Sequence, residues 1–171
     1  MSNPESDSGE TYPSLGELRL RRAPPVARTD CPMARASDLI GDRWIMLILR
    51  EALYGVGCFA DMQADLEISR SILTERLARL VDEGLLEKVT YQDPGTRPRQ
   101  AYVLTSFGRK LIVPFLAIAD WGQAITGEPS PLEMYDTATG SPLRLALVNE
   151  AGDEVEAANL GIRVGDHYKR G

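Results

Sequence analysis

Apolar residues recur at helical spacing in the central part of the chain, most clearly between residues 68 and 88. This run opens with hydroxyl-bearing and basic side chains and stops at Gly84. Its aliphatic positions, which fall on one side of a helix, are Leu73, Leu77, Leu80 and Val81. The spacing predicts a helix from Ser69 or Arg70 to Glu83, with Ser69 as its N-cap, a buried aliphatic face and a polar first turn.

Two β-type segments follow this helix, at residues 85–91 and 100–105, with a basic loop containing Pro and Gly between them. A helix that is polar in its first turns and aliphatic on the other face can lie in a DNA major groove while packed on its own domain. The fold class predicted is therefore α+β, mainly α: a winged helix-turn-helix with a two-stranded wing.

The segments before this helix fit the same fold. An apolar stripe that starts after Pro32 and includes Ile40, Trp44 and Leu47 predicts an opening helix, which Gly41 and Asp42 should bend or split. Residues 54–57 form a predicted turn, and residues 59–66 a predicted two-turn helix.

A long apolar segment follows the predicted wing. Ser106 is expected to cap a helix that runs to about Ile125, and Pro114 should kink it or divide it in two. Its apolar face, longer than a winged helix needs for its own core, comprises Leu111, Phe115, Ile118, Gly122 and Ile125. We therefore expect a protruding dimerisation helix, since a dimer is the simplest way to read a two-fold DNA site.

Three regions result from this reading of the chain. Residues 1–29 are predicted to be a flexible N-terminal arm, and residues 30–126 a winged-helix DNA-binding and dimerisation domain. Residues 127–171 are predicted to be a linker and a small β extension of two or three strands, because Leu143, Leu145 and Leu147 alternate with other residues.

Composition and charge add two constraints. The 171 residues are 43% apolar, which favours a folded protein, and no window is apolar enough for a bilayer or a signal peptide, so we expect a cytoplasmic protein and no membrane partner. The net charge of −6 is unusual for a nucleic-acid binder. Residues 94–110, however, hold four basic side chains and no acid, and DNA responds to the local field. Binding should then depend strongly on salt.

The candidate DNA-binding residues come from three segments. In the predicted recognition helix and its cap they are Ser69, Arg70, Ser71, Thr74 and Arg76; in the wing they are Thr96, Arg97, Arg99 and Gln100; Arg43 joins them from the opening helix. Arginine pairs bidentately with guanine, and hydroxyls reach base edges or phosphates. The alternatives are a solvated helix face, a basic loop that never touches DNA, and surface ion pairs, for Arg76 and Arg79 with Glu75, Asp82 or Glu83.

Two cysteines and two tryptophans are candidates for regulation. Cys31 precedes a predicted helix start, where a thiolate is favoured, and an intersubunit disulfide with Cys58 is one option. The alternative is two reduced cysteines that merely pack. Trp44 and Trp121 are either core and interface residues or the lining of an effector pocket. With His167 as the single histidine, we expect no metal, no cofactor and no catalytic triad.

Several linked motifs also resemble a known family, the HxlR-type winged helix-turn-helix regulators. The similar segments are residues 31–51, Phe59-Ala-Asp-Met, Ile68-Ser-Arg-Ser-Ile-Leu-Thr-Glu-Arg-Leu and Tyr102-Val-Leu-Thr-Ser-Phe-Gly. The resemblance, which covers roughly residues 31–123, implies a bacterial transcription factor whose homodimer is built from the N-terminal and post-wing helices. It also implies that Cys31 matches the position of a thiol sensor in some members. Others carry zinc-binding Cys pairs in a C-terminal extension, whereas no Cys follows Cys58 here.

The sequence thus predicts a sequence-specific regulator of transcription that binds double-stranded DNA as a homodimer and responds to thiol oxidation or a small-molecule effector. One alternative is a winged helix used only as a protein-interaction module, which the acidic composition favours. A second alternative, an enzyme in residues 129–171, has no supporting constellation of side chains.

Overall fold

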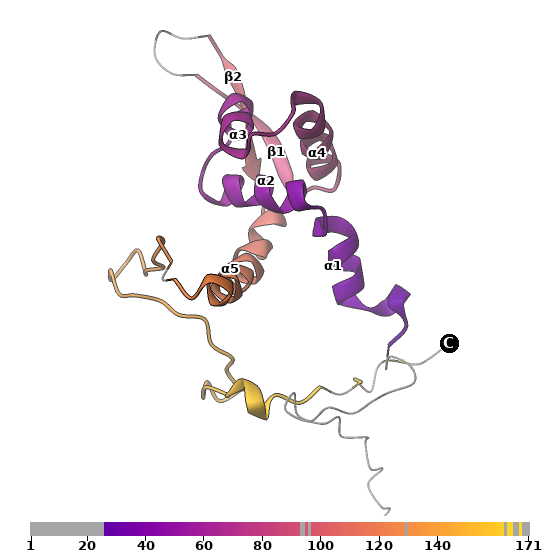
Figure 1. Ribbon diagram of the computed structural model, residues 1–171, viewed down its shortest axis with the longest axis vertical. Helices are drawn as coiled ribbons and strands as arrows, with labels where there is room; N and C mark the ends of the chain where they lie inside the picture. The colour runs from indigo at the N-terminus through magenta and orange to yellow at the C-terminus, as the bar shows by residue number, and fades with distance from the viewer. Residues whose placement is uncertain are drawn as a thin grey trace, which may run out of the picture. The chain divides into compact units, whose positions relative to one another are not determined.

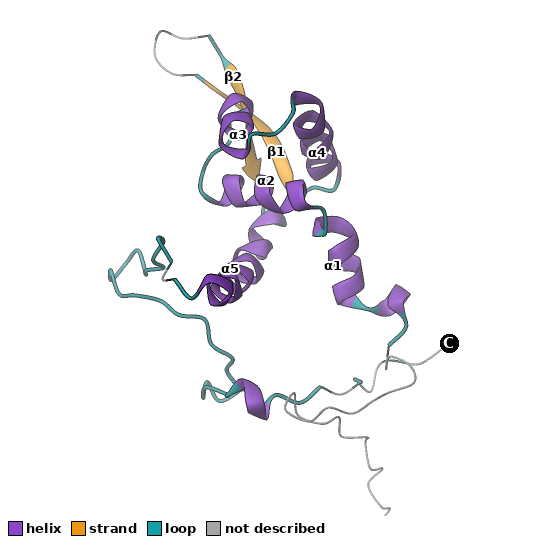
Figure 2. Cartoon of the chain, viewed as in Figure 1, coloured by secondary structure: helices purple, strands orange, loops and turns teal. Residues whose placement is uncertain are grey.

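A computed structural model of the chain describes residues 26–92, 95, 97–128, 130–162, 164–165 and 168 (Figures 1 and 2). Residues 33–133 form one compact unit, and the other described residues belong to a second. The helices are η1 (Arg28–Asp30), α1 (Pro32–Ile40), α2 (Arg43–Leu53), α3 (Phe59–Leu66), α4 (Arg70–Asp82), η2 (Gly108–Leu111), α5 (Ile112–Thr126) and η3 (Ala157–Asn159). The strands are β1 (Leu86–Tyr91) and β2 (Arg99–Leu104).

The opening helix is split into α1 and α2 where the sequence predicted a bend. The Asp42 carboxylate accepts hydrogen bonds from the backbone N–H groups of Trp44 (2.9 Å) and Ile45 (3.1 Å), and so caps α2. A Cβ atom at Gly41 would lie 2.4 Å from the Ser37 carbonyl oxygen, so this position has no room for a side chain.

The core of the winged helix is aliphatic and lies between α2, α3, α4 and the strands. The predicted inner face of α4 is confirmed, because Leu73, Leu77 and Leu80 are fully buried. The other fully buried large side chains are Ile45, Ile48, Leu49, Met62, Leu85 and Leu86. With the core on one side, the opposite face of α4 is left to solvent.

The wing is an antiparallel pair whose register runs from Leu86 opposite Leu104 to Tyr91 opposite Arg99. It starts one residue later than predicted, because the Leu85 N–H donates to the Leu80 carbonyl at 2.9 Å and still belongs to the end of the helix. Cys58 forms an isolated bridge with Ala101 and extends the pairing at the edge of β2.

The exit from the wing differs from the prediction in its cap. Thr105, not Ser106, holds this turn: its hydroxyl donates to the Gly84 carbonyl (2.6 Å) and accepts from the Gly108 N–H (3.0 Å). The chain then forms η2 before α5. Pro114 lies in the first turn of α5, where its missing N–H is not needed, so the division into two helices comes just before it.

The described residues among 134–171, called the C-terminal unit below, form turns in place of the predicted strands. Its described residues contain the isolated bridges Tyr135–Pro142 and Val148–Glu154 and the short helix η3, and no strand. Asp136 and Asn149 hold the turns through side-chain hydrogen bonds to backbone N–H groups. Leu143 and Leu147 are about half exposed, so the alternation in this segment buries no common face that would extend the pairing.

Candidate nucleic-acid interface

Helices α3 and α4 form a helix-turn-helix. Helix α3 ends at Leu66, its C-cap residue Glu67 adopts the left-handed conformation (φ 50°), and the buried Ile68 side chain anchors the turn in the core. The Ser69 hydroxyl then accepts from the Ile72 N–H at 3.4 Å, which confirms the predicted N-cap of α4.

The first two turns of α4 present polar side chains to solvent. Arg70, Ser71 and Thr74 are all exposed. The Arg70 guanidinium lies 5.3 Å from the centre of the Phe59 ring of α3, so a cation–π contact orients it at the start of the helix. The Thr74 hydroxyl donates to the Arg70 carbonyl at 2.8 Å, which leaves its oxygen free to accept. This is the face that the sequence predicted for base contacts.

The two later arginines of α4 face its own domain. Arg76 contacts the carboxylates of Asp42 (3.1 Å) and Glu75 (2.6 Å), and its side chain is only 22% exposed. Arg79 donates to the Asp38 carbonyl of α1 at 2.7 Å. The hydrogen bond from Arg76 lowers the pKa of Asp42. For Arg76 the predicted ion pair with Glu75 is present, and Asp42 is a further partner that the sequence did not reveal.

The spacing of residues along α4 distinguishes Arg76 from the exposed hydroxyl side chains of the same helix. At about 100° per residue, Thr74 and Arg76 point to roughly opposite sides of α4, whereas Ser71 and Thr74 lie within about 60° of each other. These angles, which depend only on sequence spacing, separate Arg76 from Ser71 and Thr74 around the helix, but they do not by themselves show that Arg76 faces the domain.

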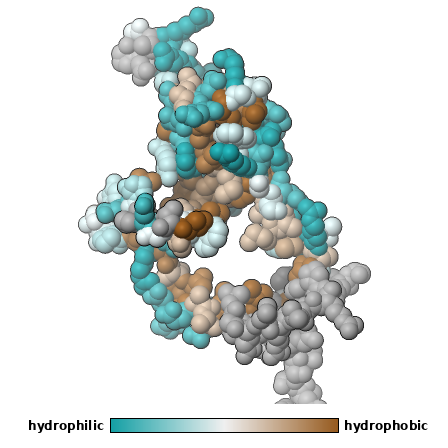
Figure 3. Space-filling view, in the orientation of Figure 1, coloured by the Kyte–Doolittle hydropathy of each residue, from teal (hydrophilic) through white to brown (hydrophobic). Residues whose placement is uncertain are grey.

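The wing carries the other predicted contacts. Arg97, Arg99 and Gln100 are exposed, and the Gln100 amide donates to the Thr90 hydroxyl on β1 at 2.7 Å. Thr96 lies outside the described residues. The end of the unit that carries the wing is largely hydrophilic on the face shown in Figure 3. Arg43 is also exposed, with its guanidinium 4.7 Å from the centre of the Trp44 ring.

Both cysteines are free thiols. The Cys58 sulfur, at the N-cap of α3, lies 2.9 Å from the Tyr91 hydroxyl at the end of β1, and this contact raises the pKa of Tyr91. Cys58 therefore links the helix-turn-helix to the wing, a role that the sequence did not reveal. Cys31 is half-buried directly before α1.

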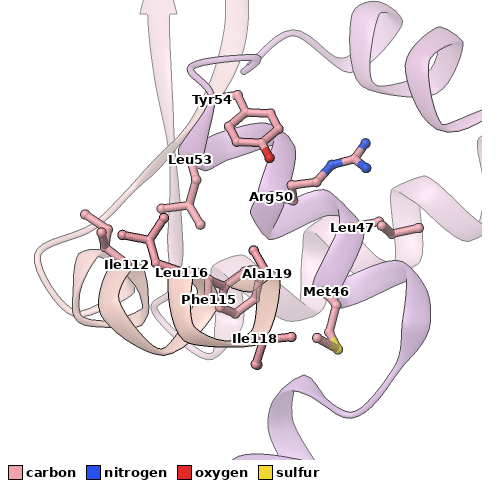
Figure 4. Close-up of a pocket in the computed structure, with 10 residues that line it drawn as sticks. All are labelled: Met46, Leu47, Arg50, Leu53, Tyr54, Ile112, Phe115, Leu116, Ile118 and Ala119. Carbon is pink, nitrogen blue, oxygen red and sulfur yellow. The ribbon is translucent and has the colours of Figure 1, made fainter. Parts of the chain in front are cut away.

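An apolar cavity of about 370 Å³ lies between α2 and α5 (Figure 4). Its lining comprises Met46, Leu47, Arg50, Leu53, Tyr54, Ile112, Phe115, Leu116, Ile118 and Ala119. The predicted pocket residues do not line it: Trp44 packs against the core, and Trp121 is 68% exposed. Arg50 is paired with the buried Glu51 carboxylate, so the cavity offers mainly apolar contact.

Metal sites and membrane spans are both absent from the residues that the structure describes. In this part of the chain no group of three or more His, Cys, Asp or Glu side chains could hold a metal ion. No helix there is both long and apolar enough to cross a membrane.

The arrangement of α3, α4 and the wing agrees with a family match. The model of the HxlR-like helix-turn-helix family matches residues 39–129. This chain belongs to the HxlR-like helix-turn-helix family. The resemblance noted in the sequence is therefore confirmed, and so is the winged-helix fold.

The similarity between this HxlR-like protein and its relatives extends beyond the winged helix. The uncharacterized HTH-type transcriptional regulator Rv3095 of Mycobacterium tuberculosis is 34% identical over 141 residues, which cover 80% of this chain and 87% of that protein. PA1607, a candidate transcription factor with a crystal structure, is 34% identical with a TM-score of 0.66, over 80% of this chain and 94% of its own. The reduced form of the redox regulator HypR is 26% identical with a TM-score of 0.50, over 56% of this chain and 94% of its own.

Proposed function

We propose that this HxlR-like protein is a sequence-specific DNA-binding regulator of transcription. The observation that carries the proposal is the polar start of α4, where Arg70, Ser71 and Thr74 are exposed while the leucines of the same helix are buried in a helix-turn-helix. In such motifs the second helix enters the major groove and its N-terminal residues contact base edges. The names of relatives such as Rv3095 support the same function.

The wing supplies contacts to the DNA backbone in this proposal. Arg97 and Arg99 are exposed near the end of a two-stranded hairpin, where they reach phosphates or a narrow minor groove beside the recognition helix. Phosphate contacts position a protein on DNA, whereas base contacts select the sequence. Because the net charge is −6, binding depends on these local charges and weakens steeply with salt.

The protein acts as a homodimer built on α5. This helix is apolar on most of its surface, although Trp121 and Ile125 are 68% and 70% exposed in the single chain. A helix that is apolar all round is normally buried, so a second copy is the natural cover. Figure 1 shows α5 and α1 extending from the helix-turn-helix away from the wing, which leaves the DNA face clear.

Regulation proceeds through a thiol or through a ligand. Cys31 is a free, half-buried thiol directly before α1, and the similar protein HypR is a redox regulator. The α2–α5 cavity, at about 370 Å³, has the size and apolar lining of a small-molecule site. Cys31→Ser separates the two routes, since an oxidant effect that survives in this variant excludes Cys31 as the sensor.

The experiment is a fluorescence-anisotropy titration of the reduced protein with labelled DNA from its own upstream region, in the presence of unrelated competitor DNA. We expect binding that the competitor does not displace, and weaker binding in Arg70→Ala and Thr74→Ala. Arg144→Ala, which alters an exposed arginine paired with Glu154 in the C-terminal unit, is the matched control. Binding lost entirely to competitor would favour the interaction-module alternative.

A further inference from the structure

Two arginines of α4 connect the helix to the junction between α1 and α2. The Arg76 guanidinium lies 3.1 Å from one carboxylate oxygen of Asp42, while the other oxygen caps α2. One carboxylate therefore holds the start of α2 and the middle of α4 together. Arg79 donates to the Asp38 carbonyl at 2.7 Å, which ties the next turn of α4 to the end of α1.

The contact between Arg76 and Asp42 is partly buried. The side chains of Arg76 and Asp42 are 22% and 29% exposed, and the Nε atom of Arg76 is buried without a hydrogen-bond partner in the part of the chain that the structure describes. A guanidinium in this position would have to break its contact with Asp42 to reach a phosphate. Arg76 is thus held against its own domain.

The junction itself allows little freedom. The Gly41 N–H donates to the Ser37 carbonyl at 2.8 Å, and a Cβ atom at Gly41 would lie 2.4 Å from that oxygen. The chain therefore passes from α1 to α2 with the backbone of Gly41 packed closely against the Ser37 carbonyl group. Any change in the angle between these helices acts directly on Asp42 and Asp38, the partners of the two arginines.

We propose that Arg76 and Arg79 are positioning residues that transmit the angle between α1 and α2 to the recognition helix. This inference rests on the proposed function, because it assigns α4 the reading of DNA. A rotation of α4 moves Arg70, Ser71 and Thr74 together relative to the groove. The linkage is a contiguous set of contacts through which an event at α1 alters DNA affinity.

Removing the charge of Asp42 tests whether Arg76 contacts DNA or positions α4, because the two roles predict opposite changes in DNA affinity. In Asp42→Asn, the side-chain oxygen still caps α2, but the amide turns an N–H group toward the guanidinium and the ion pair is lost. If Arg76 contacted phosphate directly, this variant would bind DNA more tightly, because it releases the arginine and removes a negative charge. If Arg76 positions α4, the variant binds more weakly.

Glu75→Gln is the matched control. It removes the same charge from the same arginine, but Glu75 is 72% exposed and lies on α4 itself, so the link to α2 remains. We expect Asp42→Asn to weaken specific binding about fivefold or more, the low end of couplings between sites, and Glu75→Gln to leave it unchanged or slightly tighter. Arg76→Met should weaken binding without a change in salt slope, whereas removal of a phosphate contact lowers the slope by about one.

A second measurement does not use DNA. Nitroxide labels placed at Met33 on α1 and Ala78 on α4, in a Cys31→Ser, Cys58→Ser background diluted with unlabelled protein, report the distance between the two helices. The distribution should be narrow in this background and with Glu75→Gln, and broadened or shifted with Asp42→Asn. Equal distributions, or Asp42→Asn binding DNA as tightly as Glu75→Gln, would overturn the inference. A parent protein without specific DNA binding refutes the proposed function instead, and the distances still decide the linkage.

Discussion

Trp121 provides the most direct test of the dimer proposed on α5. Its side chain is 68% exposed in the single chain. For an indole of roughly 250 Å², about 170 Å² per protomer remains to be buried, which corresponds to at most about 4 kcal/mol at ~25 cal/mol per Å². Both copies bury this area in a two-fold dimer, so Trp121→Ala acts twice on each association event.

The expected loss of association free energy is large enough to measure even if only a fraction of this upper limit is realised. A quarter of the combined upper limit is about 2 kcal/mol, which raises the dissociation constant of the dimer roughly 30-fold. Sedimentation equilibrium at concentrations from nanomolar to about 100 μM, a range that spans typical dimer constants, measures this constant directly. The folded monomer should keep its circular dichroism spectrum, because the indole contributes little to the core of its own chain.

Val148→Ala is the matched control, because Val148 is 64% exposed but lies in the C-terminal unit. We expect its dissociation constant to equal that of the wild type. The dimer on α5 is refuted if Trp121→Ala associates as tightly as the wild type, or if the wild type is a monomer at the highest concentration. An equal loss in both variants would show that the effect is not specific to this helix.

Three further results are expected from the contacts described above. Gly108→Ala should destabilise the protein by about 1–3 kcal/mol or more in urea unfolding, because the new Cβ would lie 2.2 Å from the Leu85 carbonyl oxygen; an unchanged midpoint would contradict this. Arg97→Gln with Arg99→Gln should lower the slope of log affinity against log salt by about 0.9 for each phosphate that is no longer neutralised, and a parallel line would exclude the wing from binding the DNA backbone. The lowered pKa of Asp42 stabilises the fold above its ordinary value of 3.8, and this contribution disappears as the pH falls through the lowered pKa. The stability difference between wild type and Asp42→Asn should therefore be constant near neutral pH and shrink below pH 3.8; a difference independent of pH throughout would refute the ion pair.

The winged helix could be predicted from the sequence because its elements are defined locally. The α4 pattern predicted both the buried leucines and the Ser69 cap, and α3 occupies the predicted residues 59–66. The residue that caps the turn after the wing, by contrast, could not be identified from the sequence. Ser106 and Thr105 are equally plausible caps by type, and only the position of the Gly84 carbonyl, brought close by the fold, selects Thr105.

The C-terminal segment shows where a local pattern is insufficient. Alternation such as that of Leu143, Leu145 and Leu147 predicts a strand only when a second layer covers the apolar face. In the described part of the C-terminal unit, Leu143 and Leu147 remain about half exposed, and hydrogen bonds within the turns hold the chain. Relatives such as Rv3095 and PA1607 match this chain over 80% of its length, so they share more than the winged helix.

The arginines of α4 show how one residue type can have two different environments on a single helix. Arg70 and Arg76 are six positions apart, which places them about 120° from each other around the axis. One lies against Phe59 at the exposed start of the helix, and the other meets a carboxylate that belongs to a residue 34 positions earlier in the chain. The helical angle was available from the sequence, but the partner was not, since Asp42 is identifiable there only as a helix break. The number of arginines on a recognition helix therefore does not predict its DNA contacts. The structure must first show which guanidinium groups form ion pairs with acidic residues of the same domain and which do not.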